Sequence, residues 1–365
     1  MSQSCQKNTD NMKAINIWIF KENNLDIIRL LAALQVAILH SAEFMMDETG
    51  GYFFHFLRLF PGVPIFFFIS GFLISKSFEN APNTWQYAKN RILRIYPALV
   101  VCVFINLIMV WSTGYFNIVQ IGISDVTMLF LAKASFLQFY NPEFMRNFGD
   151  GVLNGSLWTI CVELQFYLVI PILYWIFSYR KKMNNIALAV LILIFLMANR
   201  LLYIWEDGNS NLVIWKLYRV SFFPWVFMFL AGIFFQSNFK KFFALMHKVP
   251  AFIVFLLYLL IHAIWTDIEL GNRIGPIQFF LLIVVIFRFA YFLPNLGKKF
   301  FKGNDISYGI YIWHMPIVNQ LIYLQYHGDQ FNVFISVFLS VMLAAFSWIF
   351  IERPALSLKS TTLKN

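Results

Sequence analysis

Residues 25–42 read LDIIRLLAALQVAILHSA, and this stretch decides the class of fold. It is largely apolar and suits a membrane-spanning helix, yet it contains Arg29 and His40. A central arginine in such a helix costs about 2.5–3.5 kcal/mol on insertion scales, so ionisable residues at this depth indicate function by default. Helix geometry places His40 within about 20° of Arg29 on the same face and about 16 Å further along the axis. We expect both to face one cavity, one near a membrane surface and one deep inside; the alternative is a helix end and a structural core histidine.

The composition of the 365-residue chain supports this reading. Hydrophobic residues make up 60% and charged residues 13%, and the mean hydropathy is +0.67. Soluble domains have about 45–50% apolar and about 25% charged residues, so the chain is predicted to be an integral membrane protein in contact with lipid. The basic residues occur in short runs between apolar segments, as at 180–182, where they set topology. Because no basic face with interleaved aromatics exists, the net charge of +10 does not predict a nucleic-acid partner.

Basic clusters predict how many of the apolar segments cross the membrane. All basic clusters fall on one side only if segment 126–140, which carries Lys133, does not cross. We therefore predict an all-α polytopic membrane protein with about ten transmembrane helices, both termini cytoplasmic, and segment 126–140 re-entrant or interfacial on the outer face. The apolar segments are 25–45, 53–75, 95–113, 126–140, 157–178, 186–204, 219–236, 251–267, 276–292, 306–325 and 332–351.

The predicted organisation is one membrane domain with short tails. Residues 1–23 form a cytoplasmic N-terminal tail, 24–354 the transmembrane domain and 355–365 a cytoplasmic C-terminal tail. No cleavable signal peptide is evident in the polar N-terminal region. The three cysteines form no disulfide framework, and no His, Cys, Asp or Glu pair has close metal-ligand spacing, so no metal site is expected.

Two further sets of polar residues fall at informative depths. Arg91 and Arg94 share a helix face at the predicted cytoplasmic mouth, where with Arg29 they could form an anion site suited to phosphates. Ordinary positive-inside flanking charge is the alternative for these two arginines. Glu163 is predicted near His40 in depth, where pairing with the imidazole would orient the ring and raise its basicity; a structural bond to a neighbouring helix is the alternative.

A third set of residues is predicted to line the same cavity. His314 lies about two turns into an apolar segment, and Pro316 frees backbone groups beside it. Trp158 and Tyr311 could line the cavity with it or polarise a carbonyl. Gly71 would permit the close approach of a helix or a ligand.

Six motifs in order resemble the acyltransferase-3 family of integral membrane acyltransferases. The resemblance runs from about residue 24 to 354, and we expect the type of this family that lacks a fused hydrolase-like domain. The motifs are Leu25-Asp26 with Arg29 and His40, then residues 62–74 around Ser70-Gly71, 91–97 with Arg91, Arg94 and Tyr96, 156–167 with Trp158 and Glu163, 306–314 with Tyr311 and His314, and 351–354.

The chain departs from the family pattern at three places. The family usually has Gly-Leu at 27–28, Asp at Pro64 and a second Glu at Leu164. None of these is a residue with a central role in the prediction. Pro64 is expected to bend its helix.

The resemblance implies transfer of an acyl group, usually acetyl from acetyl-CoA, to a hydroxyl of a cell-envelope or exported glycan or its lipid-linked precursor, at a bacterial cytoplasmic (inner) membrane. His40 and Glu163 would be catalytic, with His40 either a general base or an acyl carrier. Trp158, Tyr311 and His314 would contact substrate. The donor would be held by Arg29, Arg91, Arg94, Ser70 and Tyr96.

Two other classes of function use similar residues. A non-enzymatic transporter or glycan flippase or polymerase also places Arg, Glu and His inside the membrane. Inverted repeats or broken helices in matching halves would favour it, and the sequence has neither. A homologue that has lost catalysis and acts as a receptor is disfavoured by the presence of Arg29, His40 and Glu163.

Overall fold

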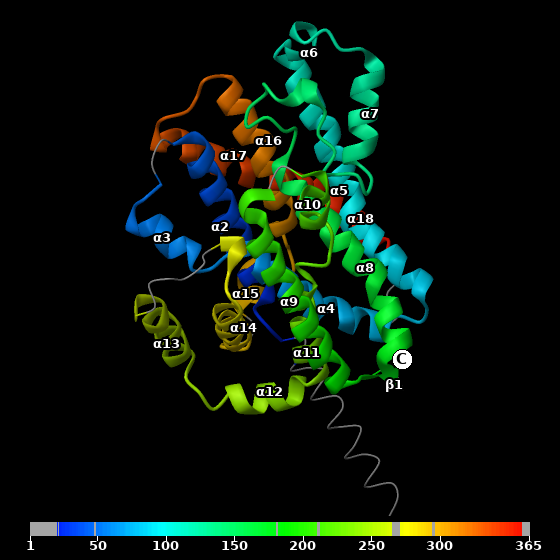
Figure 1. Ribbon diagram of the computed structural model, residues 1–365, viewed down its shortest axis with the longest axis vertical. Coiled ribbons are helices and arrows are strands. Elements are labelled where there is room, and N and C mark those ends of the chain that lie inside the picture. The colour runs from blue at the N-terminus through cyan, green and yellow to red at the C-terminus, as the bar shows by residue number, and fades with distance from the viewer. Residues whose placement is uncertain are drawn as a thin grey trace, which may run out of the picture.

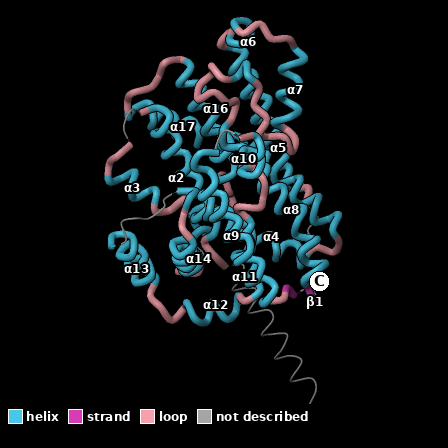
Figure 2. Tube along the Cα trace, viewed as in Figure 1, coloured by secondary structure: helices cyan, strands magenta, loops and turns pink. Residues whose placement is uncertain are grey.

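The computed structural model describes residues 20, 22–46, 49–179, 182–209, 212–264, 271–293 and 296–359. These residues are mostly helical, and their only strands form one two-residue antiparallel pair, β1 (Ser178–Tyr179) with β2 (Lys182–Met183) (Figure 2). The helices of the first half are α2 (Leu25–Met45), α3 (Tyr52–Arg58), α4 (Gly62–Asn80), α5 (Thr84–Ser112), α6 (Tyr115–Ile118), α7 (Ile123–Lys133), the 3-10 turns η1 (Glu143–Met145) and η2 (Gly155–Leu157), and α8 (Trp158–Phe177).

The second half continues the same helical pattern. Its elements are α9 (Asn185–Asn209), α10 (Val213–Arg219), α11 (Val226–Ser237), α12 (Phe239–Met246), α13 (Ala251–Ile264), the 3-10 turn η3 (Gly271–Arg273), α14 (Pro276–Ala290), α15 (Leu296–Phe301), α16 (Ser307–Tyr323), α17 (Gln330–Ser347), a π-helical turn η4 (Trp348–Glu352) and α18 (Arg353–Ser357).

The length and composition of the helices confirm an all-α polytopic membrane protein. In the described part of the chain, six helical spans are long and apolar enough to cross a bilayer, or seven if α12 and α13, bent by 89°, count as one span. The shorter α11 and α14 are also apolar. The exact number of ten crossings stays a prediction, as does the side on which each terminus lies. The tails at 1–23 and 355–365 fall mostly outside the described residues.

Helix α7 covers most of the segment predicted not to cross. Its eleven residues rise about 16 Å, half of a hydrocarbon core about 30 Å thick, so it is too short to span. Helices α6 and α7 project together at one end of the molecule, and α12 lies at the opposite end (Figure 1). Whether α7 is re-entrant or interfacial stays a prediction.

Glycine sets the close packing of α4 against α11. A Cβ atom added at Gly71 would lie 1.9 Å from the carbonyl oxygen of Phe229, and one added at Gly232 would lie 2.2 Å from that of Phe68. Small residues at helix interfaces allow such backbone approach in membranes. The close helix approach expected at Gly71 is thus confirmed.

Helices α2, α16 and α17 form a second packed group (Figure 1). Residues 307–319 of α16 are all buried, and a Cβ added at Gly309 would meet the Cα of Ala344 at 2.9 Å. The hydroxyl oxygens of Ser41 and Ser336 lie 3.0 Å apart and link α2 to α17. This group fixes the face of α2 that carries His40 against α16.

Two local expectations are wrong. Helix α5 begins at Thr84, eleven residues before the predicted segment, because the side chain of Asn83 caps it by accepting from the amide of Gln86. Arg91 and Arg94 therefore lie within α5, ahead of its apolar part. Pro64 does not bend α4, since it sits in the first turn, where a helix needs no amide donor, and the chain instead breaks before Pro61.

Candidate active site

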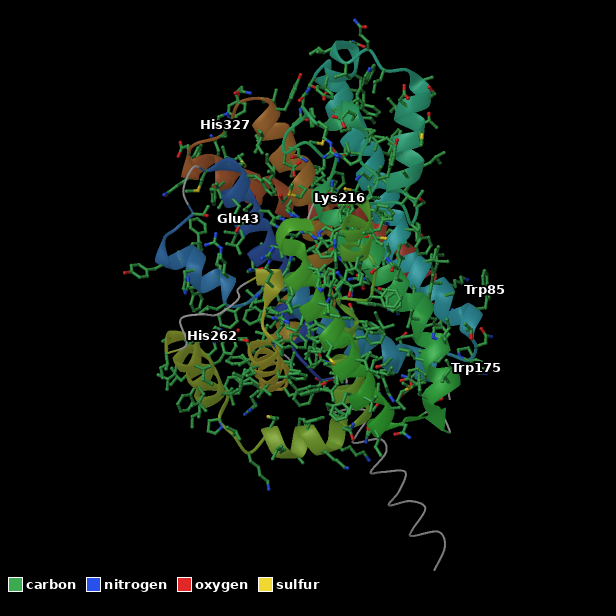
Figure 3. All side chains as sticks on the ribbon, in the orientation of Figure 1. Glu43, Trp85, Trp175, Lys216, His262 and His327 are labelled. Atoms are coloured by element: carbon green, nitrogen blue, oxygen red, sulfur yellow. The ribbon has the colours of Figure 1, made fainter. Side chains whose placement is uncertain are left out.

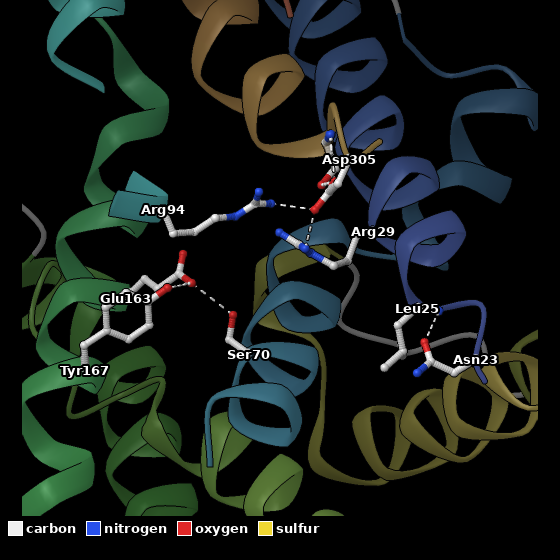
Figure 4. Close-up of polar contacts among 9 residues, drawn as sticks. Asn23, Leu25, Arg29, Ser70, Arg94, Glu163, Tyr167 and Asp305 are labelled. Carbon is white, nitrogen blue, oxygen red and sulfur yellow. Dashed lines mark hydrogen bonds and ion pairs between the residues drawn. The ribbon is translucent and has the colours of Figure 1, made fainter. Parts of the chain in front are cut away.

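Two arginines from different helices converge on one aspartate. Arg29 Nη1 and Arg94 Nη2 lie 2.6 and 2.5 Å from Oδ2 of Asp305, in the loop before α16 (Figure 4). The other carboxylate oxygen accepts from the amide and the hydroxyl of Ser307, at 3.1 and 2.5 Å. Burial would raise the pKa of Asp305, but the two guanidiniums and these hydrogen bonds outweigh it and hold that pKa below the usual range. Asp305 is therefore an ionised anchor that joins α2, α5 and α16.

The same groups line a cavity of about 250 Å³. Arg91 also lines it, donating to the hydroxyl of Ser77 at 3.1 Å with its guanidinium 5.7 Å from the Tyr167 ring. Lys359, just past α18, is a fourth cation in the wall. Burial and repulsion from the three arginines lower the pKa of Lys359 to about 7. The predicted convergence of Arg29, Arg91 and Arg94 is observed, with a carboxylate that the sequence reading did not include.

Glu163 lies at the edge of this cavity but not on His40. Its Oε1 accepts from the hydroxyls of Ser70 at 3.1 Å and Tyr167 at 2.5 Å (Figure 4). The expected pairing of Glu163 with the His40 imidazole is therefore wrong: the partners of this carboxylate come from α4 and from the next turn of α8. Ser70 lines the cavity, and its role in donor binding stays a prediction.

A narrower cavity of about 40 Å³ continues from the first one along α8. Both cavities are lined by Arg29, Ser70, Glu163 and Tyr308. The narrow cavity reaches Tyr311, whose hydroxyl lies 2.6 Å from Thr159 Oγ1. The ring of Tyr311 in turn lies 5.8 Å from that of His314, measured between centroids. The arginines, Glu163, Tyr311 and His314 thus form a series that is linked by shared cavity walls and one ring contact.

Beyond Tyr311 lies a pair of histidines, neither of which lines these two cavities, so the expectation that Arg29 and His40 face one cavity with His314 in its wall is not met here. Nδ1 of His40 lies 3.0 Å from Nε2 of His314, and Nδ1 of His314 lies 3.3 Å from the carbonyl oxygen of Ile310. A carbonyl only accepts, so the proton of neutral His314 is on Nδ1, and its Nε2 must accept from Nδ1–H of His40. This arrangement leaves the lone pair of His40 on Nε2, the atom that can act as a base or nucleophile. His314 is fully buried, while His40 is partly exposed.

Two predicted site residues lie elsewhere. Tyr96 is half-buried on α5 beside the hydrophobic core and is not among the lining residues of the two cavities. Trp158 lines a different and larger cavity on the other side of the first turn of α8. Among the described residues no group of three His, Cys, Asp or Glu side chains could hold a metal ion.

Three site residues escaped the sequence reading. Asp305 is two residues before Ser307, and the requirement of a membrane arginine for a counter-ion was the signal that could have found it. Tyr167 is one turn after Glu163 on the same face, a spacing that already placed the two side chains together. No local sequence pattern marks Lys359 as a site residue, because it comes close to Arg91 and Arg94 only in the folded chain.

Comparison with known proteins agrees with this site. The model of a family described as an acyltransferase domain matches residues 22–352. A nodulation protein 10 of Rhizobium leguminosarum bv. viciae is 29% identical over 93% of this chain and 94% of its own. An O-acetyl transferase of Shigella phage Sf6 is 26% identical over 94% of this chain and 98% of its own. The O-acetyltransferase OatA of Staphylococcus aureus is 23% identical, over 90% of this chain and 56% of its own.

No solved structure matches the chain significantly. The family match covers far more than half of the sequence and includes every residue of the arginine–histidine series except Lys359. The chain therefore belongs to the acyltransferase-3 family of membrane acyltransferases.

Proposed function

We propose that the protein is a membrane O-acetyltransferase that moves an acyl group, most simply acetyl, from cytoplasmic acyl-CoA to a hydroxyl of a cell-envelope or exported glycan. The observation that carries the proposal is the histidine pair beside Tyr311, which lines a narrow cavity that shares Arg29, Ser70 and Glu163 with the cationic cavity. Relatives named O-acetyltransferases support the reaction type. O-antigen, capsule, exopolysaccharide and lipid-linked precursors are the candidate acceptors.

The cationic cavity suits the phosphates of the donor. Four cations, Arg29, Arg91, Arg94 and Lys359, face two carboxylates, Asp305 and Glu163, so the wall retains positive charge when both are ionised. Arginine forks bind phosphate oxygens with two parallel hydrogen bonds. Ser70 would add a hydroxyl at the junction with the narrow cavity.

The distance to His40 suits an extended thioester arm. The helix rise between Arg29 and His40 is about 16 Å. The arm would follow the narrow cavity past Glu163 to Tyr311. The ring of His314 lies next to the ring of Tyr311 at this point. Glu163 would hold this passage open through its bonds to Ser70 and Tyr167, rather than act on His40 directly.

Two chemical routes use Nε2 of His40. In the first, this nitrogen takes the proton of the glycan hydroxyl while the hydroxyl oxygen attacks the thioester carbonyl; the C–S bond breaks and the proton passes to the leaving thiolate. In the second, Nε2 attacks the carbonyl, the C–S bond breaks, and a thiolate leaves an acyl-imidazolium on His40. The glycan hydroxyl then attacks this acyl group, the C–N bond breaks, and the hydroxyl proton is taken by Nε2 and released to neutralise the thiolate. In both routes His40 becomes positively charged, and donation of Nδ1–H to His314 stabilises that charge.

The proposed setting is the bacterial cytoplasmic membrane with both termini in the cytoplasm. The acyl-CoA would enter from the cytoplasmic side, and the glycan from the opposite side. The second route would carry the acyl group across without carrying the CoA.

The test is acetyl transfer in proteoliposomes. Radiolabelled acetyl-CoA is supplied with and without the de-O-acetylated envelope polysaccharide of the producing strain, and label is followed in the protein, the polysaccharide and water. We expect label in the polysaccharide; label in the protein without acceptor would select the acyl-histidine route. Absence of CoA release with acetyl-, succinyl- and longer acyl-CoA donors would overturn the proposal, and vectorial movement of unmodified glycan would support the transporter class.

A further inference from the structure

A third cavity, of about 430 Å³, lies on the other side of the first turn of α8 from the donor path. Its wall combines amide side chains and aromatic rings with four cationic side chains, those of Lys133, Lys216, Arg219 and Arg273. The amides come from Gln138, Asn141, Asn154 and Asn272, and the indoles from Trp158 and Trp225. None of the described acidic side chains lines it.

Two of these amides have unpartnered atoms. Gln138 is 1% exposed, yet neither its Oε1 nor its Nε2 has a hydrogen-bond partner. Oδ1 of Asn141 is also buried and unpartnered. Leaving a buried polar group unpaired is costly, and such groups are rare in folded proteins. Both residues line one cavity, although these atoms are closed off from it in this structure, so a ligand that turns the two side chains toward itself would supply the missing partners.

Neighbouring bonds fix the backbone of Gln138 and one side of the Asn141 amide. The backbone carbonyl of Gln138 accepts from Nζ of Lys133 at 2.8 Å, and Nδ2 of Asn141 donates to the carbonyl of Gly151 at 2.9 Å. Asn154 serves as a contrast, because its Nδ2 donates to Ile312 and its Oδ1 accepts from Ser156. Among the described residues that line this cavity, the buried side-chain atoms without a partner are those of Gln138 and Asn141.

The indoles provide an apolar wall. The ring centroids of Trp158 and Trp225 lie 5.3 Å apart at 47°, and Nε1 of Trp225 is already bonded to the carbonyl of Arg219 at 2.8 Å. A pyranose ring presents an apolar C–H face and a rim of hydroxyls that both donate and accept. The aromatic wall can pack against the C–H face, and the unpaired amides can hydrogen-bond the hydroxyls. An acyl chain would contact the aromatic wall but would leave the amides unpaired.

We propose that this cavity, defined here as the acceptor cavity, binds the sugar ring that receives the acyl group. Gln138 and Asn141 hydrogen-bond its hydroxyls, and Trp158 packs against its apolar face. The assignment rests on the proposed function, because it supplies the second substrate of that reaction.

The position of the acceptor cavity fits this role. Trp158 lines it, while the next residue, Thr159, lines the narrow cavity of the donor path. Thr159 Oγ1 is bonded to the hydroxyl of Tyr311, and Ser156 Oγ donates to the Tyr311 carbonyl at 3.2 Å. The first turn of α8 is therefore the partition between the two substrates.

The test is Gln138→Leu. Removing an unpartnered buried amide leaves no new orphan group, so the variant should fold at least as stably as the wild type. We expect the KM for the de-O-acetylated polysaccharide to rise about 3- to 10-fold, as loss of one or two hydrogen bonds implies, with the KM for acetyl-CoA unchanged. Trp158→Leu should raise the KM for the polysaccharide as well. The matched control is Trp175→Leu on the same helix, which should leave this KM unchanged. The side chain of Trp175 is 84% exposed and lies at the edge of the molecule (Figure 3).

A binding measurement separates this inference from the reaction. Oligosaccharides of the same polysaccharide are titrated into the detergent-solubilised wild type and the Gln138→Leu variant, with tryptophan fluorescence and thermal stabilisation as readouts. Binding that weakens in the variant supports the acceptor cavity even if no acetyl is transferred. Equal binding, or an unchanged KM for polysaccharide in both Gln138→Leu and Trp158→Leu, would overturn it.

Discussion

His314 accepts a hydrogen bond from His40 over 3.0 Å between ring nitrogens, while its own Nδ1 faces the carbonyl oxygen of Ile310. The backbone of α16 therefore determines which nitrogen of His40 remains basic. The first prediction concerns His314 as a positioning residue. His314→Gln retains an acceptor for Nδ1–H of His40, whereas His314→Leu does not. We expect kcat to fall about 10- to 100-fold in the Leu variant, with partial recovery in the Gln variant and the KM for acetyl-CoA unchanged in both.

Equal loss in the two His314 variants would count against this role. The control is His262→Gln, on α13 at the periphery, where the ring contacts the carbonyl of Tyr258. It should transfer acetyl at the wild-type rate (Figure 3).

A second prediction is the acid sensitivity that Asp305 confers. Its folded pKa lies below the unfolded value of 3.8, so its contribution to stability is complete above pH 3.8 and declines as pH falls through the lower folded pKa. Asp305→Asn leaves Arg29 and Arg94 without their counter-ion, which for a buried pair costs about 3–5 kcal/mol. Tm measured in detergent should drop at pH 7 and change less with acidification below pH 4 than in the wild type. If Asp305→Asn had the same Tm as the wild type at neutral pH, this would contradict the role of Asp305 as the anchor of the two arginines.

A third prediction uses the lowered pKa of Lys359, about 7. Its ammonium is charged below pH 7 and loses its charge above, so its attraction for the donor phosphates weakens as pH rises. In Lys359→Met the KM for acetyl-CoA should be raised a few-fold at pH 6 and only slightly at pH 8.5. Because phosphate also titrates near pH 6, the quantity to compare is the ratio of variant to wild type at each pH. A ratio independent of pH would remove Lys359 from the donor site.

A fourth prediction tests the packing of α4 on α11. Gly71→Ala places a methyl group 1.9 Å from a backbone oxygen that cannot move without displacing α11. The folded yield after detergent extraction should collapse. Gly50→Ala is the matched control, since its Cβ meets nothing within 4 Å, and its yield should equal that of the wild type.

The sequence predicted the helical membrane class and most of the site, because both depend on local signals. Arg29 and His40 stand out in an apolar helix, and family motifs carried His314 and Tyr311. The pairing of Glu163 was wrong because depth along a helix does not determine direction around it: Glu163 faces Ser70 and Tyr167, and His314 faces His40. Lys359 and the unpartnered Gln138 became visible only through contacts between distant segments.

The most direct test of the central claim is acetyl transfer by His40→Ala beside the wild type, in proteoliposomes with radiolabelled acetyl-CoA and the de-O-acetylated polysaccharide. His40→Ala should remain in the membrane and should still bind CoA, because the arginine cavity is remote from the substitution. Its Tm should be somewhat lower than that of the wild type, because Nε2 of the buried His314 loses its hydrogen-bond donor. We predict that its transfer rate falls at least about 100-fold, the contribution of a positioned acid–base group. A rate within a few-fold of the wild type would contradict the account, since no other described residue has been placed at the reacting carbonyl.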